Sequence, residues 1–196
     1  RKLIHNIDII MLSWLMDFET VARYVIVSRM AFLLHVPEQA LNMALSPFYA
    51  GLPAAKASLK TMITISAIIS TVVAIIGGAL LLLMQEPLTR LFFDAGATFD
   101  PNVLLVSVLR AVYACAAGPA ATILLMGGFE RLNIRIGLAA LALNIVLNAA
   151  LIPWMGAIGA ALGTAAALVL INTAAVVLVR RNFELNTTVF SRRSIE

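Results

Sequence analysis

The sequence predicts an all-α polytopic membrane protein with six transmembrane helices. Hydrophobic residues make up 62% of the chain and charged residues 12%, whereas soluble domains average about 45–50% and about 25%. Several apolar stretches approach the roughly 20 residues that a helix needs to cross a bilayer. Runs such as residues 75–84 do not alternate between polar and apolar side chains, as the strands of a membrane barrel would. The spans are therefore expected to be helices.

The six spans follow one another in a single domain of residues 1–181. They are predicted at residues 3–16, 20–46, 62–84, 103–126, 136–152 and 157–179. Proline and glycine are expected to interrupt the helices at residues 46–53, 127–128 and 153–156, and residues 85–102 to hold a short amphipathic helix at the membrane interface. The polar residues 182–196 are predicted to form a loosely ordered cytoplasmic tail. Because the chain starts with Arg1 and a short span, we expect a fragment or one half of a longer protein.

Basic residues are concentrated on one side of the predicted membrane. Ten of the 14 Lys and Arg residues precede the first span or follow the second, fourth and sixth: Arg1, Lys2, Lys56, Lys60, Arg131, Arg135, Arg180, Arg181, Arg192 and Arg193. The opposite loops contain one base, Arg90, beside the acids Asp17, Glu19, Glu86, Asp94 and Asp100. By the positive-inside rule both termini are cytoplasmic, in a bacterial-type cytoplasmic (inner) membrane.

Other functional classes have little support in the sequence. The net charge of +4 follows from membrane orientation, and no basic patch with interleaved aromatic residues indicates nucleic-acid binding. Neither a glycine-rich phosphate loop nor a Ser/His/Asp set is present, so we expect no enzyme and no cofactor. No set of His, Cys, Asp and Glu residues shows metal-ligand spacing, and no metal is expected. Cys115 is the only cysteine and is expected to be a small buried apolar residue.

The second span contains most of the polar residues within the predicted membrane. One of its faces, at about 100° per residue, holds Thr20, Tyr24, Ser28, His35, Glu38, Gln39, Asn42 and Ser46. Such a face must contact protein or water, because lipid cannot satisfy its hydrogen bonds. Glu38 and His35 lie near mid-depth, where ionisable groups are usually functional. The structural alternative is a neutral Glu38 hydrogen-bonded to His35 or to a neighbouring helix. Pro37 is expected to kink the helix between them.

Two arginines and one aspartate complete the candidate site. Arg29 and Arg110 lie within predicted spans, and if both face one cavity they suit a phosphate or pyrophosphate group. Alternatively each arginine pairs with an acid or extends to the outer interface, as is expected for Arg23. Asp8 lies near the start of the first span, where the helix dipole alone favours an acid.

The last two spans contain small and amide side chains at helical spacing. Asn144 and Asn148 are one turn apart and are expected to hydrogen-bond across to other helices. Gly159 and Gly163 permit close helix approach, either within the bundle or, as the minority interpretation, at a dimer interface. Trp154 is expected to anchor the chain at the membrane interface.

These residues also resemble a known family. Residues 144–164 resemble the late-helix signature of polysaccharide (O-antigen type) flippases, in the multidrug/oligosaccharidyl-lipid/polysaccharide exporter superfamily. Further similarities keep the family's order, at residues 6–11, 24–29, 46–51, 86–93 and 128–131. The resemblance covers about residues 3–185. It implies the C-terminal lobe of a two-lobed exporter, which works by alternating access with an N-terminal six-helix lobe absent from this sequence.

The resemblance also implies a function. Members of the family move lipid-linked sugars across the cytoplasmic membrane, so the expected partners are a lipid-linked anionic oligosaccharide, membrane lipid and the N-terminal lobe. Arg29, Arg110, Ser28, Gln39 and Asn42 would bind the substrate. The expected ion-coupling residues are Glu38, His35 and Asp8.

Two alternatives remain open. One is a multidrug cation antiporter of the same superfamily, coupled to protons or sodium through Asp8 and Glu38. The other is a non-transporting assembly subunit of a polysaccharide-export complex. Two arginines within the spans favour an anionic substrate over a cationic drug.

Overall fold

Long apolar segments dictate the architecture. The computed structural model describes residues 4–50, 56–92 and 100–189, and within these ranges every regular element is an α-helix. The helices are α1 (Ile4–Leu15), α2 (Phe18–Leu33), α3 (Val36–Ala50), α4 (Lys56–Leu83), α5 (Gln85–Phe92), α6 (Pro101–Ala117), α7 (Ala120–Met126), α8 (Glu130–Met155) and α9 (Ala157–Phe183). The all-helical prediction is confirmed for these residues, and α5 lies within the predicted interfacial segment.

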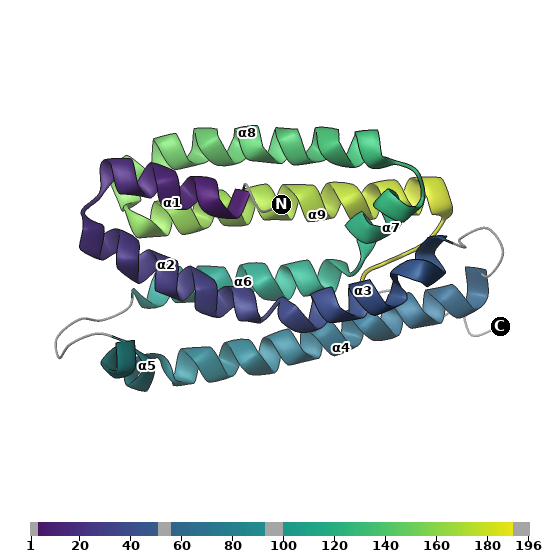
Figure 1. Cartoon of the computed structure of the whole chain (residues 1–196), viewed down its shortest axis with the longest axis horizontal. Helices are drawn as coiled ribbons and strands as arrows, with labels where there is room; N and C mark the ends of the chain where they lie inside the picture. Colours follow the sequence, from purple (N-terminus) through teal and green to yellow (C-terminus); the bar gives the residue numbers. More distant parts are fainter. Residues whose placement is uncertain (1–3, 51–55, 93–99, 190–196) are drawn as a thin grey trace.

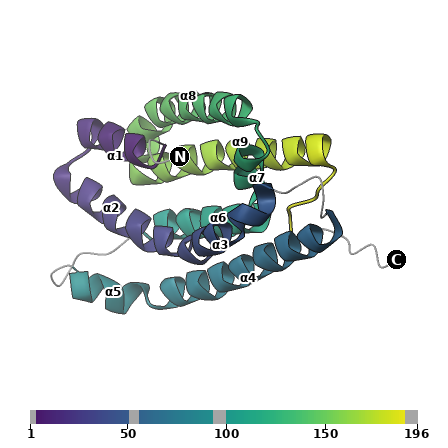
Figure 2. The same cartoon turned by 45° about the vertical axis from the view of Figure 1, so that its right-hand side comes forward.

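The helices run back and forth along one axis (Figure 1). Helices α8, α9, α6 and α4 lie side by side, with α8 and α4 at opposite edges in both views (Figures 1 and 2). The segment α1–α2–α3 crosses this row obliquely: α1 contacts α8 and α9, α2 contacts α6, and α3 contacts α4 and α7. Helix α6 is therefore the centre of the bundle, because α2, α4 and α9 all pack against it.

The number of confirmed spans is smaller than predicted. Within the described residues, α4, α8 and α9 are long and apolar enough to cross a membrane, and α6 with α7 makes a fourth span if the bent pair counts as one. Helix α1 has 12 residues, about 18 Å at helical rise, against about 30 Å of hydrocarbon. The α2–α3 segment is interrupted and contains Glu19, Arg23 and Arg29, which lower its hydropathy.

Large apolar side chains cover the outer faces of the two edge helices. On α4 and α8 the exposed residues include Ile65, Ile69, Val73, Ile76, Leu80, Ile134, Leu138 and Val146. A soluble protein rarely leaves contiguous apolar faces in water. The pattern is that expected of helices whose outer faces contact lipid, and it supports a membrane protein.

The second predicted span is broken in its middle. Helix α2 ends at Leu33, a turn covers Leu34 and His35, and α3 begins at Val36. Pro37 has no N–H to donate back to the preceding turn, and the N–H groups of Leu34 and His35 instead donate to Ala31 and Phe32 three residues back. The kink predicted at Pro37 is thus confirmed as a break. The interruption predicted at residues 46–53 is wrong at Pro47, which lies inside α3; residues 51–55 lie outside the described residues.

The fourth predicted span is also broken, which the sequence analysis did not anticipate. Helices α6 and α7 meet at 46° across Gly118 and Pro119. Gly118 has a φ of +67°, a conformation that other residues rarely adopt. The helix nevertheless ends near Gly127, as predicted.

The segment after α9 packs back onto this second break. The Thr187 hydroxyl donates to the Ala117 carbonyl (3.0 Å), and the Val189 N–H donates to the Ala116 carbonyl (3.2 Å). Leu185 and Thr187 are fully buried. The predicted loose tail from residue 182 is therefore wrong for its described part: α9 extends to Phe183, and residues 184–189 satisfy carbonyls that the helix break leaves free. Residues 190–196 lie outside the described residues.

Helices α8 and α9 form the closest pair in the bundle. The predicted four-residue turn is wrong, because Pro153 lies inside α8 and Gly156 alone, with a φ of +57°, separates the two helices. Gly159 and Gly163 are buried where an added methyl group would overlap α8, at the Leu151 backbone and the Asn148 amide. The packing interpretation of these two glycines is confirmed.

Clusters of basic residues and the exposed tryptophans lie at opposite ends of the bundle. The start of α4, the start of α8 and the end of α9 lie at one end (Figure 1), and these segments contain Lys60, Arg131, Arg135, Arg180 and Arg181. The α1–α2 junction and the α8–α9 turn lie at the other, with the exposed aromatic residues Trp14, Phe18 and Trp154. Alternating helix direction therefore brings the basic segments together.

Candidate functional site

The two helix breaks lie against one another in the interior of the bundle. The Cys115 thiol, two residues before the end of α6, is 3.8 Å from the Leu34 carbonyl in the α2–α3 turn. Glu38 lines a narrow pocket with Gly118 and Pro119 of the α6–α7 break. The α2–α3 and α6–α7 breaks are far apart in the sequence, but in the structure their non-helical backbone lies beside the same buried polar side chains.

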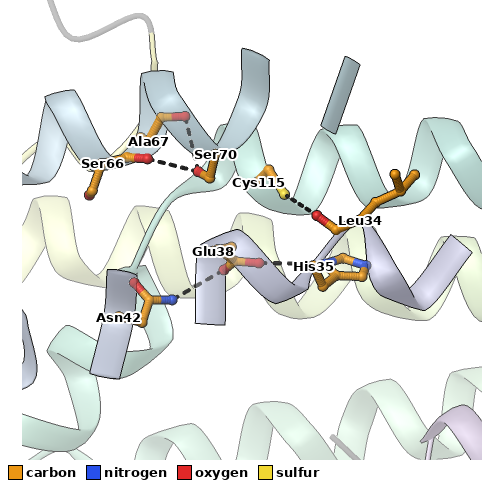
Figure 3. A network of polar contacts seen from close by, with 8 residues as sticks. All are labelled: Leu34, His35, Glu38, Asn42, Ser66, Ala67, Ser70 and Cys115. Atoms are coloured by element: carbon orange, nitrogen blue, oxygen red, sulfur yellow. Dashed lines mark hydrogen bonds and ion pairs between the residues drawn. The ribbon is translucent and has the colours of Figure 1, made fainter. Parts of the chain in front are cut away.

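Three ionisable side chains meet between these breaks (Figure 3). His35 Nδ1 lies 3.4 Å from Glu38 Oε2, and the Asn42 amide donates to Glu38 Oε1 at 3.3 Å. One ligand atom each from His35, Glu38 and Cys115 lies within 4.8 Å of the other two, and all three residues are buried. His35 Nε2 is buried without a hydrogen-bond partner. The hydrogen bond between Glu38 and His35 that the sequence allowed is therefore present, but it is long at 3.4 Å.

Helix α4 supplies the hydroxyl groups beside this cluster. Ser66, Ser70 and Thr71 are buried on its inner face, and each donates to a carbonyl of α4 itself. Ser66 and Ser70 line the pocket next to Glu38, which has no room for a water molecule. The pocket is therefore closed to water, and the three hydroxyl groups bond within α4 rather than to Glu38.

A second buried network surrounds Asp8. Its carboxylate accepts hydrogen bonds from the Tyr24 hydroxyl (2.6 Å) and the Thr164 hydroxyl (2.9 Å). Asn144 donates to Thr164 (3.2 Å), and Asn148 donates to Asn144 (3.3 Å). Four helices, α1, α2, α8 and α9, are thus joined by one chain of polar groups. The cross-helix bonding predicted for the asparagines is confirmed for Asn144.

Arg110 is the charged partner of this network. Its side chain is 95% buried on α6, and its positive charge acts on both Asp8 and Tyr24. Its Nε has no hydrogen-bond partner. A buried carboxylate with a nearby guanidinium avoids the full cost of an isolated charge in the interior. Asp8 thus has buried partners on two other helices, in addition to the helix-dipole effect expected from its place near the start of α1.

A surface cavity leads to this network from the end that holds the exposed aromatic residues. It has a volume of about 410 Å³ and is lined by Thr20, Arg23, Tyr24, Val27, Asp100, Pro101, Val103 and Ala157. Arg23 pairs with Glu19 on the same helix. Tyr24, which is 2% exposed, lines this cavity and also donates to Asp8, so the cavity lies next to the buried network.

The predicted polar face does not line a single cavity. Tyr24 faces Asp8, and His35 and Glu38 face Cys115, whereas Gln39 is exposed and Ser28 and Asn42 are half-buried. Arg29 is exposed while Arg110 is buried, so the two arginines do not share a cavity within the residues that the structure describes. The division falls at the break between α2 and α3, with Tyr24 before it and Glu38 after it.

The cluster of His35, Glu38 and Cys115 has no metal-ligand spacing along the sequence, and it is brought together only by the fold. His35 and Glu38 are one turn apart, but Cys115 comes from a distant helix, so spacing along the chain cannot find the cluster. The available signal was Gly118-Pro119, which predicts a helix interruption close to Cys115. The partners of Asp8 were likewise not visible in the sequence, because Tyr24 and Thr164 come from other helices.

The geometry of these two clusters is the basis for assigning a function. Helix breaks with buried ionisable groups are typical of transporters and are uncommon in purely structural membrane bundles. Comparison with protein-family models, curated proteins and solved structures finds no match to this chain.

Proposed function

We propose that this chain is the C-terminal lobe of a membrane flippase that translocates lipid-linked oligosaccharide or polysaccharide precursors by alternating access. The observation that supports this function best is the meeting of the α2–α3 and α6–α7 breaks at Glu38, His35 and Cys115. Interrupted helices supply unwound backbone and helix ends that bind substrates and ions at mid-membrane in many transporters. The family resemblance of the sequence agrees with this proposal.

The complete transporter would have six spans in this lobe and a second six-helix lobe beside it. The α1 and α2–α3 segments, too short or too polar alone, would complete their spans against the partner lobe and the bilayer. Both termini would be cytoplasmic, in the inner membrane, because the basic segments gather at one end of the bundle.

Arg110 and Arg29 would attract the anionic pyrophosphate or acidic sugars of the substrate. Arg110 would act from the bundle interior and the exposed Arg29 from the surface that faces the second lobe. Ser28, Gln39 and Asn42 lie on the same segment as Arg29 and would hydrogen-bond to sugar hydroxyls. Guanidinium groups suit phosphate because they donate two parallel hydrogen bonds.

Glu38 with His35, and Asp8 with Tyr24, would couple transport to an ion. His titrates near neutral pH and exchanges protons readily. The cavity of about 410 Å³ gives a route for an ion from solvent to Tyr24, which contacts Asp8. Coupling at Asp8 would therefore be accessible from the end of the bundle that contains the exposed aromatic residues.

A second candidate is a multidrug cation antiporter, and the burial of the two acidic residues favours it. Both acids, Asp8 and Glu38, are buried, whereas of the two arginines only Arg110 is. Since Arg110 offsets Asp8, Glu38 alone would remain to attract a cationic drug. We prefer the flippase because an antiporter has no evident use for the positive charge of Arg110.

The test is replacement of arginine in the full-length gene product, expressed in its own host. We expect Arg110→Ala to reduce surface polysaccharide by about tenfold at normal protein level, which corresponds to the loss of one charge-assisted hydrogen bond in transport. Arg110→Lys should retain part of the export. Arg180→Ala, an exposed arginine at the basic end, is the matched control and should export normally.

The alternatives predict different results. An antiporter would keep surface polysaccharide in Arg110→Ala but lose drug resistance in Glu38→Gln. An assembly subunit would keep export in every charge variant that is expressed. Normal export by Arg110→Ala would therefore exclude the flippase mechanism proposed above.

A further inference from the structure

The side chains between the two helix breaks have the donor chemistry of a transition-metal site. Imidazole, thiolate and carboxylate are the three protein ligand types of zinc, and His35, Cys115 and Glu38 offer one of each. We propose that these residues bind a divalent zinc-class ion between α3 and α6. The proposal goes beyond the flippase assignment, because neither the transport mechanism nor the family resemblance invokes a metal. When the metal is bound, His35 and Glu38 are its ligands, and Asp8 with Tyr24 is the pair left for ion coupling.

Geometry supports a shared ion. Zinc bonds of about 2.0–2.3 Å place tetrahedral ligand atoms about 3.5 Å apart. His35 Nδ1 and Glu38 Oε2 are already 3.4 Å apart, and the Cys115 thiol lies with them inside 4.8 Å. Small side-chain movements would bring the three ligand atoms from within 4.8 Å of one another to the separation of about 3.5 Å that a tetrahedral zinc site needs. The Asn42 amide, which donates to Glu38 Oε1, would orient the carboxylate as outer-shell partners do.

Charge balance favours the same occupant. A thiolate and a carboxylate together neutralise a divalent cation, and the imidazole adds no charge, so the loaded site is neutral. Neutrality matters because burying a net charge within a membrane protein is costly. Binding releases the thiol proton of Cys115 to solvent, together with the Glu38 proton if that carboxyl is protonated.

The residues are poorly satisfied without an ion. The contacts among these side chains are long: His35 Nδ1 lies 3.4 Å from Glu38 Oε2, and the Cys115 thiol lies 3.8 Å from the Leu34 carbonyl. A bound ion would replace these weak contacts with metal–ligand bonds. Sodium and magnesium prefer oxygen ligands, whereas the thiolate selects zinc, cobalt or a similar ion.

Cobalt(II) gives a direct test in the purified full chain in detergent micelles. Because Cys115 is the only cysteine, a thiolate-to-cobalt charge-transfer band can arise from this residue alone. We expect the band to saturate at one cobalt per chain and to disappear when zinc is added. His35→Gln and Glu38→Gln should each weaken cobalt binding at least about tenfold, as the loss of one metal ligand predicts.

Two controls separate ligation from structure. Ser70→Ala removes a neighbouring hydroxyl but no ligand, so its cobalt spectrum should equal that of the unmodified chain. Zinc should raise the unfolding temperature of the unmodified chain but not that of Cys115→Ser, whose helix content is checked by circular dichroism. Absence of the band, or unchanged affinity in both His35→Gln and Glu38→Gln, would overturn the proposal. Neither measurement depends on transport, so the flippase assignment can fail while the metal site stands.

Discussion

Asp8 shows how one buried carboxylate can join a helical bundle. It is 2% exposed and accepts hydrogen bonds from α2 and α9, while Arg110 of α6 supplies nearby positive charge. A carboxylate in this position would be strongly unfavourable without such partners. The network therefore contributes to the specificity of helix packing as well as to the proposed coupling.

Tyr24→Phe tests this contribution without changing shape. Loss of the hydroxyl leaves Asp8 with one fewer donor, and we expect the free energy of unfolding to fall by about 1 kcal/mol. Tyr113→Phe is the matched control, because the Tyr113 hydroxyl also bonds across helices, to Thr173, but its residue is 38% exposed. Unfolding in mixed detergent micelles, followed by circular dichroism, measures both. Equal losses in the two variants would contradict a special role for Asp8.

Individual polar residues were predictable to different degrees. Asn144 and Glu38 stand out within apolar segments, and polar groups there must find partners, so their burial could be expected. The partners themselves could not, since Thr164 and Cys115 come from distant parts of the chain. Arg29 was left open by the sequence, which allowed a shared cavity, an acid partner or the interface, and in the structure it is an exposed residue of α2.

Helix contacts in this bundle depend on a few small side chains. Gly163 of α9 provides the space that the Asn148 amide occupies, so a methyl group there would overlap the amide oxygen. Gly137, in contrast, is a helical glycine of α8 with no atom within 4 Å of an added methyl group. The two positions therefore separate the effect of packing from that of helix propensity.

Alanine at these two glycines should act in opposite directions. Gly163→Ala forces Asn148 to move and should cost about 1–3 kcal/mol of stability, as overpacking does. Gly137→Ala should be neutral or stabilise the protein by up to about 1 kcal/mol, because glycine is a poor helix former. Thermal unfolding in detergent is the measurement. A stable Gly163→Ala variant would show that α8 and α9 are less closely packed than described.

The helices were more predictable than their interruptions. Apolar length predicted the positions of α4, α8 and α9 to within several residues, because hydropathy is set locally. Pro37 predicted the first break by removing an N–H donor. The second break was missed although Gly118-Pro119 has the same composition as a turn, since the apolar run on both sides suggested one span. The packing of residues 184–189 depends on tertiary contacts with Ala116 and Ala117, which no local pattern contains.

The proposed orientation in the membrane rests on the distribution of basic residues and tryptophans along the bundle. Basic residues lie at the starts of α4 and α8 and the end of α9, and Trp14 and Trp154 are exposed at the opposite end. This distribution agrees with the positive-inside rule and with tryptophan at an interface. The single helix α8 carries both markers, with Arg131 at its start and Trp154 at its end.

Cysteine labelling can test this orientation on one helix. In a Cys115→Ser background, Trp154→Cys, at a position 89% exposed, should react with a membrane-impermeant maleimide in intact cells. Arg131→Cys should react only after the membrane is permeabilised, because α8, at about 39 Å, is long enough to cross the bilayer. Labelling of both positions from outside would contradict a transmembrane α8. The reversed pattern would place the basic end outside.

The return of residues 184–189 to the α6–α7 break has a consequence for how the protein is made. The Ala117 carbonyl accepts a hydrogen bond from Thr187, 70 positions further along the chain, so α6 is synthesised before that donor. If α6 and α7 cross the bilayer as one bent span, an unsatisfied carbonyl in hydrocarbon would cost several kcal/mol. We therefore expect the nascent segment to stay hydrated or to form one straight helix until residues 184–189 have been synthesised.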